Sequence, residues 1–278
     1  MKLEKLQNFN KRKGPVVVIV LDGVGIGRHD NGDAVFQAHP QHFNKYIEEA
    51  KANNLYAELR AHGPAVGLPS IEDMGNSEVG HNALGAGQIV SQGAKRVNEA
   101  IGNGDIFKSA SWKSIIEETA KAGKALHFFG LLSDGNVHSN VTQLFKILDG
   151  AKNSGAKKIR VHPLLDGRDV APDSGLIYIG QLEDKLAELR KAGVDAVIAS
   201  GGGRMHVTMD RYNSDWKIVE RGFNAMTYGK VMESDLVNGY KGYYSSAKEA
   251  IEEARKLFPE KQDQFNPTFV IVDNKGQP

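Results

Sequence analysis

The second half of the chain alternates short apolar runs with segments that carry one apolar face at helical spacing. The runs 125–132, 159–165 and 194–199 each have the length and composition of a buried strand. Each run ends in a polar loop, and the next segment has helix-period apolar residues, such as Leu144 and Leu148. This order predicts parallel strands joined by helices. We therefore expect an α/β fold whose mainly parallel sheet is covered on both faces.

An earlier apolar run, 16–21, also predicts a buried strand, and it stops abruptly at Asp22-Gly23. Asp22 would then be a carboxylate at the C-terminal end of a strand, where open α/β sheets bind their ligands. An Asp-Gly pair is equally typical of a plain turn. A dinucleotide-binding fingerprint is a weaker interpretation of the glycines that follow, because its third glycine comes one residue early, with Arg28 where the pattern needs glycine.

Charged side chains gather in the loops that follow the three later strands. Because the carboxyl ends of parallel strands lie along one edge of a sheet, we expect these loops to converge. Arginine pairs bidentately with carboxylate and phosphate, so three arginines in one cleft predict an anionic ligand that carries both groups. Each arginine alone would be an ordinary solvated residue, and the histidine an ordinary loop residue. The converging residues are His138, Arg168, Asp169, Arg204 and Arg211.

Ser77 stands among small residues in the stretch 74–82, directly before a predicted helix. The unpaired N–H groups of a helix start favour a serine alkoxide or a phosphate ester. An ordinary serine cap would look the same in isolation. Beside the anion-binding loops, the stretch predicts a nucleophilic serine.

Composition narrows the class of protein. With 278 residues, of which 40% are hydrophobic and 25% charged, the chain has the composition of a globular protein of one or two domains. A net charge of +1, without basic blocks, argues against a nucleic-acid partner. The absence of cysteine excludes disulfides and thiolate metal sites. No apolar run approaches a membrane span, and the start lacks the apolar region of a signal peptide, so we expect a cytoplasmic protein without a membrane partner.

Taken in order, the motifs resemble those of the cofactor-independent (2,3-bisphosphoglycerate-independent) phosphoglycerate mutases of the alkaline phosphatase superfamily. The resemblance runs from about residue 14 to the last residue. Val24 departs from it, because an aromatic residue is usual after Asp-Gly, and Arg204 and Arg211 lie slightly further apart than in the family pattern. The motifs are Leu21-Asp22-Gly23, the stretches 75–81, 85–87, 133–139 and 166–169, Gly201-Gly202-Gly203-Arg204 and Met209-Asp210-Arg211.

The resemblance implies a metalloenzyme that interconverts 3-phosphoglycerate and 2-phosphoglycerate through a phosphoserine. Ser77 would be the nucleophile, and Asp22 and Ser77 would be ligands of one of two divalent ions. Manganese is the expected metal, with magnesium or cobalt as alternatives, and no 2,3-bisphosphoglycerate is needed. The five loop residues named above would retain the substrate and the glycerate formed from it. The complete enzyme would be a monomer.

The same resemblance implies two domains. Residues 1–91 would be the first segment of an alkaline-phosphatase-like metal domain, and 92–278 most of an inserted α/β substrate (phosphotransferase) domain. In the family the remaining metal ligands, a lysine and a further arginine pair come later than residue 278, so we expect the N-terminal half of a longer enzyme. Two alternatives stay open. One is another metal-dependent phosphomutase or phosphatase of the superfamily; the other, for these 278 residues alone, is an inactive substrate-binding fragment.

Overall fold

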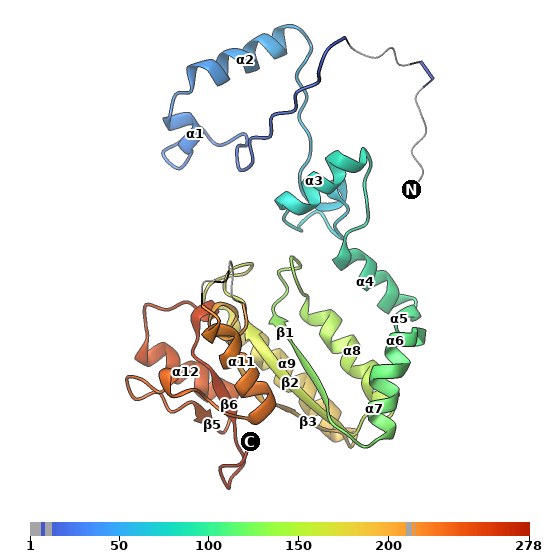
Figure 1. Cartoon of the computed structure of the whole chain (residues 1–278), viewed down its shortest axis with the longest axis vertical. Helices are drawn as coiled ribbons and strands as arrows, with labels where there is room; N and C mark the ends of the chain where they lie inside the picture. Colours follow the sequence, from blue (N-terminus) through green and yellow to red (C-terminus); the bar gives the residue numbers. More distant parts are fainter. Residues whose placement is uncertain (1–6, 9–12, 210–212, 214) are drawn as a thin grey trace. The chain divides into compact units, whose positions relative to one another are not determined.

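A computed structural model describes residues 7, 8, 13–209, 213 and 215–278. The chain forms two compact units, Met1–Arg60 and Ala61–Pro278 (Figure 1). Each unit is described by itself below. The expected domain boundary between residues 91 and 92 stays a prediction.

The first unit contains the helices α1 (Ala34–Gln37) and α2 (Gln41–Ala52). The predicted strand 16–21 is wrong for this chain, because the segment pairs with no described strand. Its six apolar side chains, from Val16 to Leu21, are 52–79% exposed. A strand forms only where a neighbouring strand supplies hydrogen-bond partners, and no described residue of this unit does so. The apolar composition of a central strand is therefore present without the sheet that would bury it.

The described part of the second unit contains a six-stranded sheet in the order β1-β2-β4-β6-β5, with β3 also paired to β2. The pairs β1–β2, β2–β3, β2–β4 and β5–β6 are parallel, and only β4–β6 is antiparallel. The expected mainly parallel α/β sheet is confirmed. The strands are β1 (Leu126–Leu132), β2 (Lys158–Leu165), β3 (Asp195–Ile198), β4 (Ser200–Gly203), β5 (Tyr243–Tyr244) and β6 (Phe269–Ile271).

The helices α3 to α7 precede the first strand of the sheet, and α8 to α12 lie between its strands. Short 3₁₀ turns lie at Gly63–Val66, Glu233–Asp235 and Asp263–Phe265, and the π-helical turn Lys113–Glu117 joins α6 to α7. The helices are α3 (Ser77–Ala86), α4 (Gly93–Gly102), α5 (Asp105–Lys108), α6 (Ala110–Trp112), α7 (Glu118–Lys121), α8 (Val141–Asn153), α9 (Gly175–Lys191), α10 (Arg204–Val207), α11 (Lys217–Tyr228) and α12 (Ala247–Leu257).

Helices cover both faces of the sheet, as expected. The main core joins the buried faces of α8, α9 and α12 to the strands, and it includes Phe269 of β6. The next residue along β6, Val270, instead packs with Ala225 of α11 and with Val231. Because successive side chains of a strand point to opposite faces, α11 lies on the face opposite to the main core (Figure 1). None of the described helices is both long and apolar enough to cross a membrane.

Candidate functional site

The loops after β1, β2 and β4 meet at the buried carboxylate of Asp166, the first residue after β2. Ser133, from the loop after β1, donates its hydroxyl to Asp166 Oδ2 at 2.6 Å. Arg204, the first residue of α10 after β4, donates Nη1 to Asp166 Oδ1 at 2.6 Å. The sequence predicted that these three loops converge, and the contacts confirm it. Asp166 itself was not among the predicted site residues, although it begins the Asp-Gly-Arg-Asp motif at a strand end.

Arg204 is 2% exposed and sits between two carboxylates. Its Nη1 also contacts Asp169 Oδ2, at 2.8 Å. Its Nε is buried and has no hydrogen-bond partner among the described residues. Burial alone would lower the pKa of Arg204, but the hydrogen bonds to Asp169 and Asp166 outweigh it and raise the pKa. The guanidinium therefore stays charged, and its buried Nε–H group is available to a ligand.

The pKa of Asp166 moves in the opposite direction. Burial alone would raise it, but the hydrogen bonds from Ser133, from the backbone N–H of Asp169 and from Arg204 outweigh burial and hold it below its usual value. Asp166 is thus a carboxylate at neutral pH.

His138 and Arg168 are the other predicted loop residues that the structure describes. His138 is 55% exposed in its side chain, and its Nε2 lies 4.0 Å from Asp169 Oδ2. The Arg168 side chain is exposed, and it forms no ion pair with any residue that the structure describes. Arg211 lies outside the described residues. The structure thus brings His138, Asp169 and Arg204 together, while the role of each toward a ligand stays a prediction.

Ser77 is the first residue of α3, as predicted. The N-cap is the preceding residue, Asn76, whose Oδ1 accepts from Val79 N at 3.1 Å, so the serine hydroxyl is not used to cap the helix. Gly75 is needed where it stands, because a Cβ there would lie 1.7 Å from the carbonyl oxygen of Ala61. The backbone before Ser77 therefore packs closely against that of Ala61, and a helix begins at Ser77 itself. Its role as nucleophile stays a prediction.

A cavity of about 380 Å³ lies between the start of α3 and the loop after β1. Asn76 and Glu78, the neighbours of Ser77, line one side, and His138 lines the other. The two walls are joined by a hydrogen bond from Asn136 Nδ2 to Asp73 Oδ1 at 2.7 Å. The residues 136 and 73 are distant in sequence, and no local pattern predicted their contact. We refer to this cavity as the α3 pocket.

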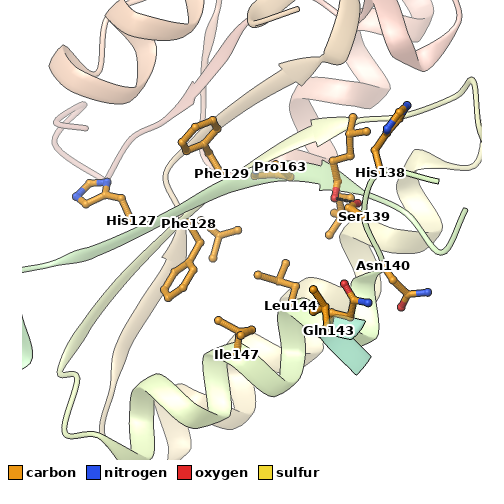
Figure 2. Close-up of a pocket in the computed structure, with 15 residues that line it drawn as sticks. His127, Phe128, Phe129, His138, Ser139, Asn140, Gln143, Leu144, Ile147 and Pro163 are labelled. Atoms are coloured by element: carbon orange, nitrogen blue, oxygen red, sulfur yellow. Dashed lines mark hydrogen bonds between the residues drawn. The ribbon is translucent and has the colours of Figure 1, made fainter. Parts of the chain in front are cut away.

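A second pocket, of about 410 Å³, runs along β1 and α8 and shares His138 with the α3 pocket. Figure 2 shows His138, Ser139 and Asn140 at one end of the pocket, His127 at the other, and Leu144 and Ile147 of α8 between them. The end with His138 continues the α3 pocket, because both pockets share that residue.

The predicted metal ligands, Asp22 and Ser77, belong to different units, so a shared ion stays a prediction. Oxygen donors of their kind suit hard divalent ions. However, no three histidine, cysteine, aspartate or glutamate side chains lie close enough to hold a metal ion within the part of the chain that the structure describes. Two ligands are too few for a two-metal site, which fits this chain only if other residues complete it.

Comparison with known proteins gives one consistent family. A family model described as BPG-independent PGAM N-terminus matches residues 97–278. A probable 2,3-bisphosphoglycerate-independent phosphoglycerate mutase of Leptospira interrogans is 46% identical over 280 residues, covering 100% of this chain and 48% of the relative. The corresponding mutase of Trypanosoma brucei brucei is 46% identical over 263 residues, covering 95% of this chain and 45% of the relative.

A solved structure supports the same grouping. A crystal structure of Leishmania mexicana phosphoglycerate mutase at low cobalt concentration matches with a TM-score of 0.81 and 46% identity, covering 93% of this chain and 45% of that one. The chain thus spans about half the length of the relatives that it matches.

Proposed function

The chain belongs to the 2,3-bisphosphoglycerate-independent phosphoglycerate mutases, and from this membership we propose that the whole protein interconverts 3-phosphoglycerate and 2-phosphoglycerate in glycolysis and gluconeogenesis. One observation in this chain carries the proposal furthest. Asn76 and Glu78, the residues on either side of Ser77, line one wall of the α3 pocket, and the loop after β1, with His138, lines the other. A phosphorylated carboxylic acid needs both within reach of one cavity.

The proposed reaction has two transfers that mirror each other. Ser77 Oγ forms a bond to phosphorus, the bond from phosphorus to the substrate oxygen breaks, and that oxygen takes up a proton as Ser77 loses one. The glycerate then turns within the pocket, and its other hydroxyl takes the phosphoryl group back. His138, Arg168 and Asp169 would hold the glycerate in the interval, together with the arginines 204 and 211. Retention matters because water would hydrolyse the phosphoserine of an enzyme that had lost its glycerate.

The helix start contributes to this chemistry directly. The first N–H groups of α3 have no partner within the helix, and Asn76 Oδ1 accepts from that of Val79. The positive end of the helix would stabilise negative charge on a phosphoryl group attached to Ser77.

We further propose that the complete protein holds two divalent ions, manganese first, with Asp22 and Ser77 among their ligands. Such ions neutralise phosphoryl oxygens when bound. The remaining ligands would come from residues beyond the present 278. We also propose a cytoplasmic monomer without nucleic-acid or membrane partners. Its phosphatase-like metal domain would begin with residues 1–91, and residues 92–278 would form most of the substrate domain.

These 278 residues cover only about half the length of their relatives, so we make a separate proposal for them alone. Without a described cluster of metal donors, they should bind substrate weakly and catalyse nothing. The alternative reaction for the whole protein, hydrolysis by a related phosphatase, gives different products. It consumes water and releases glycerate and inorganic phosphate in place of an isomer.

Phosphorus NMR of the complete protein tests the proposal. Manganese is added, 2,3-bisphosphoglycerate is left out, and 3-phosphoglycerate is the substrate. We expect 2-phosphoglycerate as the main product and a loss of orders of magnitude in rate for Ser77→Ala. The control Ser246→Ala removes a serine hydroxyl that caps α12, at a cost of about 1 kcal/mol in stability, and should remain active. Phosphate as the main product, or more than a tenth of the rate in Ser77→Ala, would contradict the proposal.

A further inference from the structure

Asp166 joins all three loops of the candidate site through its own two oxygens. Oδ2 accepts from Ser133 Oγ at 2.6 Å, and Oδ1 accepts from Arg204 Nη1 at 2.6 Å. Oδ1 also accepts from the backbone N–H of Asp169 at 3.1 Å and from that of Arg168 at 3.3 Å. The carboxylate therefore contacts one residue from the loop after β1, two from its own loop and one from α10.

Asp166 cannot meet a ligand itself. It is 2% exposed, and both of its oxygens already have donors. Three of its four donors bond Oδ1 and one bonds Oδ2. Burial keeps a substrate from what is left of Oδ2, and the carboxylate would repel an anionic substrate. Any effect of Asp166 on a ligand must therefore pass through the residues that it holds.

Three of the residues that Asp166 contacts, Arg168, Asp169 and Arg204, are those predicted to bind the ligand. Arg204 shares one Nη1 between Asp166 and Asp169, and its buried Nε is left without a partner among the described residues. Asp166 thus fixes the plane of the guanidinium through one nitrogen and leaves another available. The same carboxylate also accepts hydrogen bonds from the backbone N–H groups of Arg168 and Asp169, and so fixes that part of the loop. Loss of one contact would loosen several ligand-binding groups together.

We propose that Asp166 is a positioning residue that holds the three substrate loops in the arrangement that retains glycerate between the two phosphoryl transfers. This inference rests on the proposed mutase function. The charge of Asp166 is essential to it, because charge-assisted hydrogen bonds are roughly twice as strong as neutral ones.

The decisive variant is Asp166→Asn in the complete protein. Asparagine keeps the shape and one acceptor oxygen but removes the charge, and its amide group no longer accepts. We expect the KM for 3-phosphoglycerate to rise about tenfold or more, since bonds to charged groups are lost, while kcat falls less. The ratio of phosphate release to isomerisation should also rise. A purely structural role would lower thermal stability without moving that ratio.

Asp263→Asn is the matched control. Asp263 is buried to a similar degree and pairs with Arg255, and its carboxylate accepts from Gly175 N, at the start of α9. Its bond to the loop after β2 is made by its backbone N–H, to Pro172 O, and the substitution keeps that bond. It should lower the melting temperature comparably and leave KM and the release ratio at wild-type values. Equal KM and release ratio in Asp166→Asn and the control would overturn the inference.

A milder variant decides the matter if Asp166→Asn does not fold. Ser133→Ala removes only the donor to Oδ2 and should move KM and the release ratio in the same direction by a smaller factor. A folded Ser133→Ala protein with wild-type values would then refute the inference. Failure of the wild-type protein to interconvert the phosphoglycerates would instead refute the proposed function, so the two failures are distinguishable.

Discussion

The stability of this fold should fall between pH 6.5 and pH 4 because of one buried histidine, His162 on β2. The side chain is 2% exposed. Its Nε2 lies 3.0 Å from Nδ1 of His127 on β1, and its Nδ1 lies 2.7 Å from Ser200 Oγ on β4. Burial, with a smaller contribution from His127, lowers the pKa of His162 from 6.5 to about 4. Burial, with a smaller contribution from Arg160, also lowers the pKa of His127.

The direction follows from the two states. In the folded protein His162 stays neutral down to about pH 4, whereas in the unfolded chain it binds a proton below about pH 6.5. The unfolded state therefore binds more protons in this window, and the free energy of unfolding decreases as the pH falls through it. At 1.36 kcal/mol for each pKa unit, His162 accounts for about 3 kcal/mol of lost stability across the window.

Urea unfolding at several pH values between 8 and 4.5 measures this loss. The variant His162→Gln should be less stable at pH 8, but its free energy of unfolding should change much less with pH. The informative quantity is the slope of that free energy against pH. The control His42→Gln, at an exposed position of α2, should keep the wild-type slope. Asp166 and Asp235, whose pKa values are lowered from 3.8, lose their contribution only below this window. A wild-type slope near zero, or an unchanged slope in His162→Gln, would refute the reasoning.

Three further predictions concern the site. In the complete protein, Arg168→Ala should raise the ratio of phosphate release to isomerisation more than it slows phosphoryl transfer, and normal isomerisation at low substrate concentration would contradict this. Asn136→Gly keeps the positive φ of +58° but removes the bond to Asp73, so the amides of 70–80 should exchange hydrogen faster; unchanged exchange would show that the bond does not hold the pocket walls together. Residues 1–278 alone should show no mutase activity with added manganese, which a coupled assay checks, and appreciable turnover would contradict the need for ligands beyond residue 278.

The strands β1 and β2 were predictable because their signals are local. Each has a buried apolar run, a polar loop and a helix-period stripe, and β1 and β2 begin within a residue of the predicted positions. The segment 16–21 has the same composition but pairs with no described strand, so composition alone did not make a strand. The antiparallel pairing of β4 with β6 also depends on residues distant in the sequence, and no local pattern near β4 predicts it.

The site was predictable to the extent that it follows from strand ends. His138, Asp169 and Arg204 do meet, because parallel strands deliver their loops to one edge. The partners of those residues were not predictable. The sequence did not assign Asp166 as the shared acceptor, and it did not pair Asn136 with Asp73, because both contacts depend on how separate segments pack.

Mass spectrometry of the complete protein after brief incubation with 3-phosphoglycerate and manganese tests the central claim most directly. We predict a single phosphoryl group on the peptide that contains Ser77, present in the wild-type and Ser246→Ala proteins and absent in Ser77→Ala. Phosphate on another residue, or rapid isomerisation by a protein that never carries phosphate on Ser77, would contradict a phosphoserine mechanism at the start of α3.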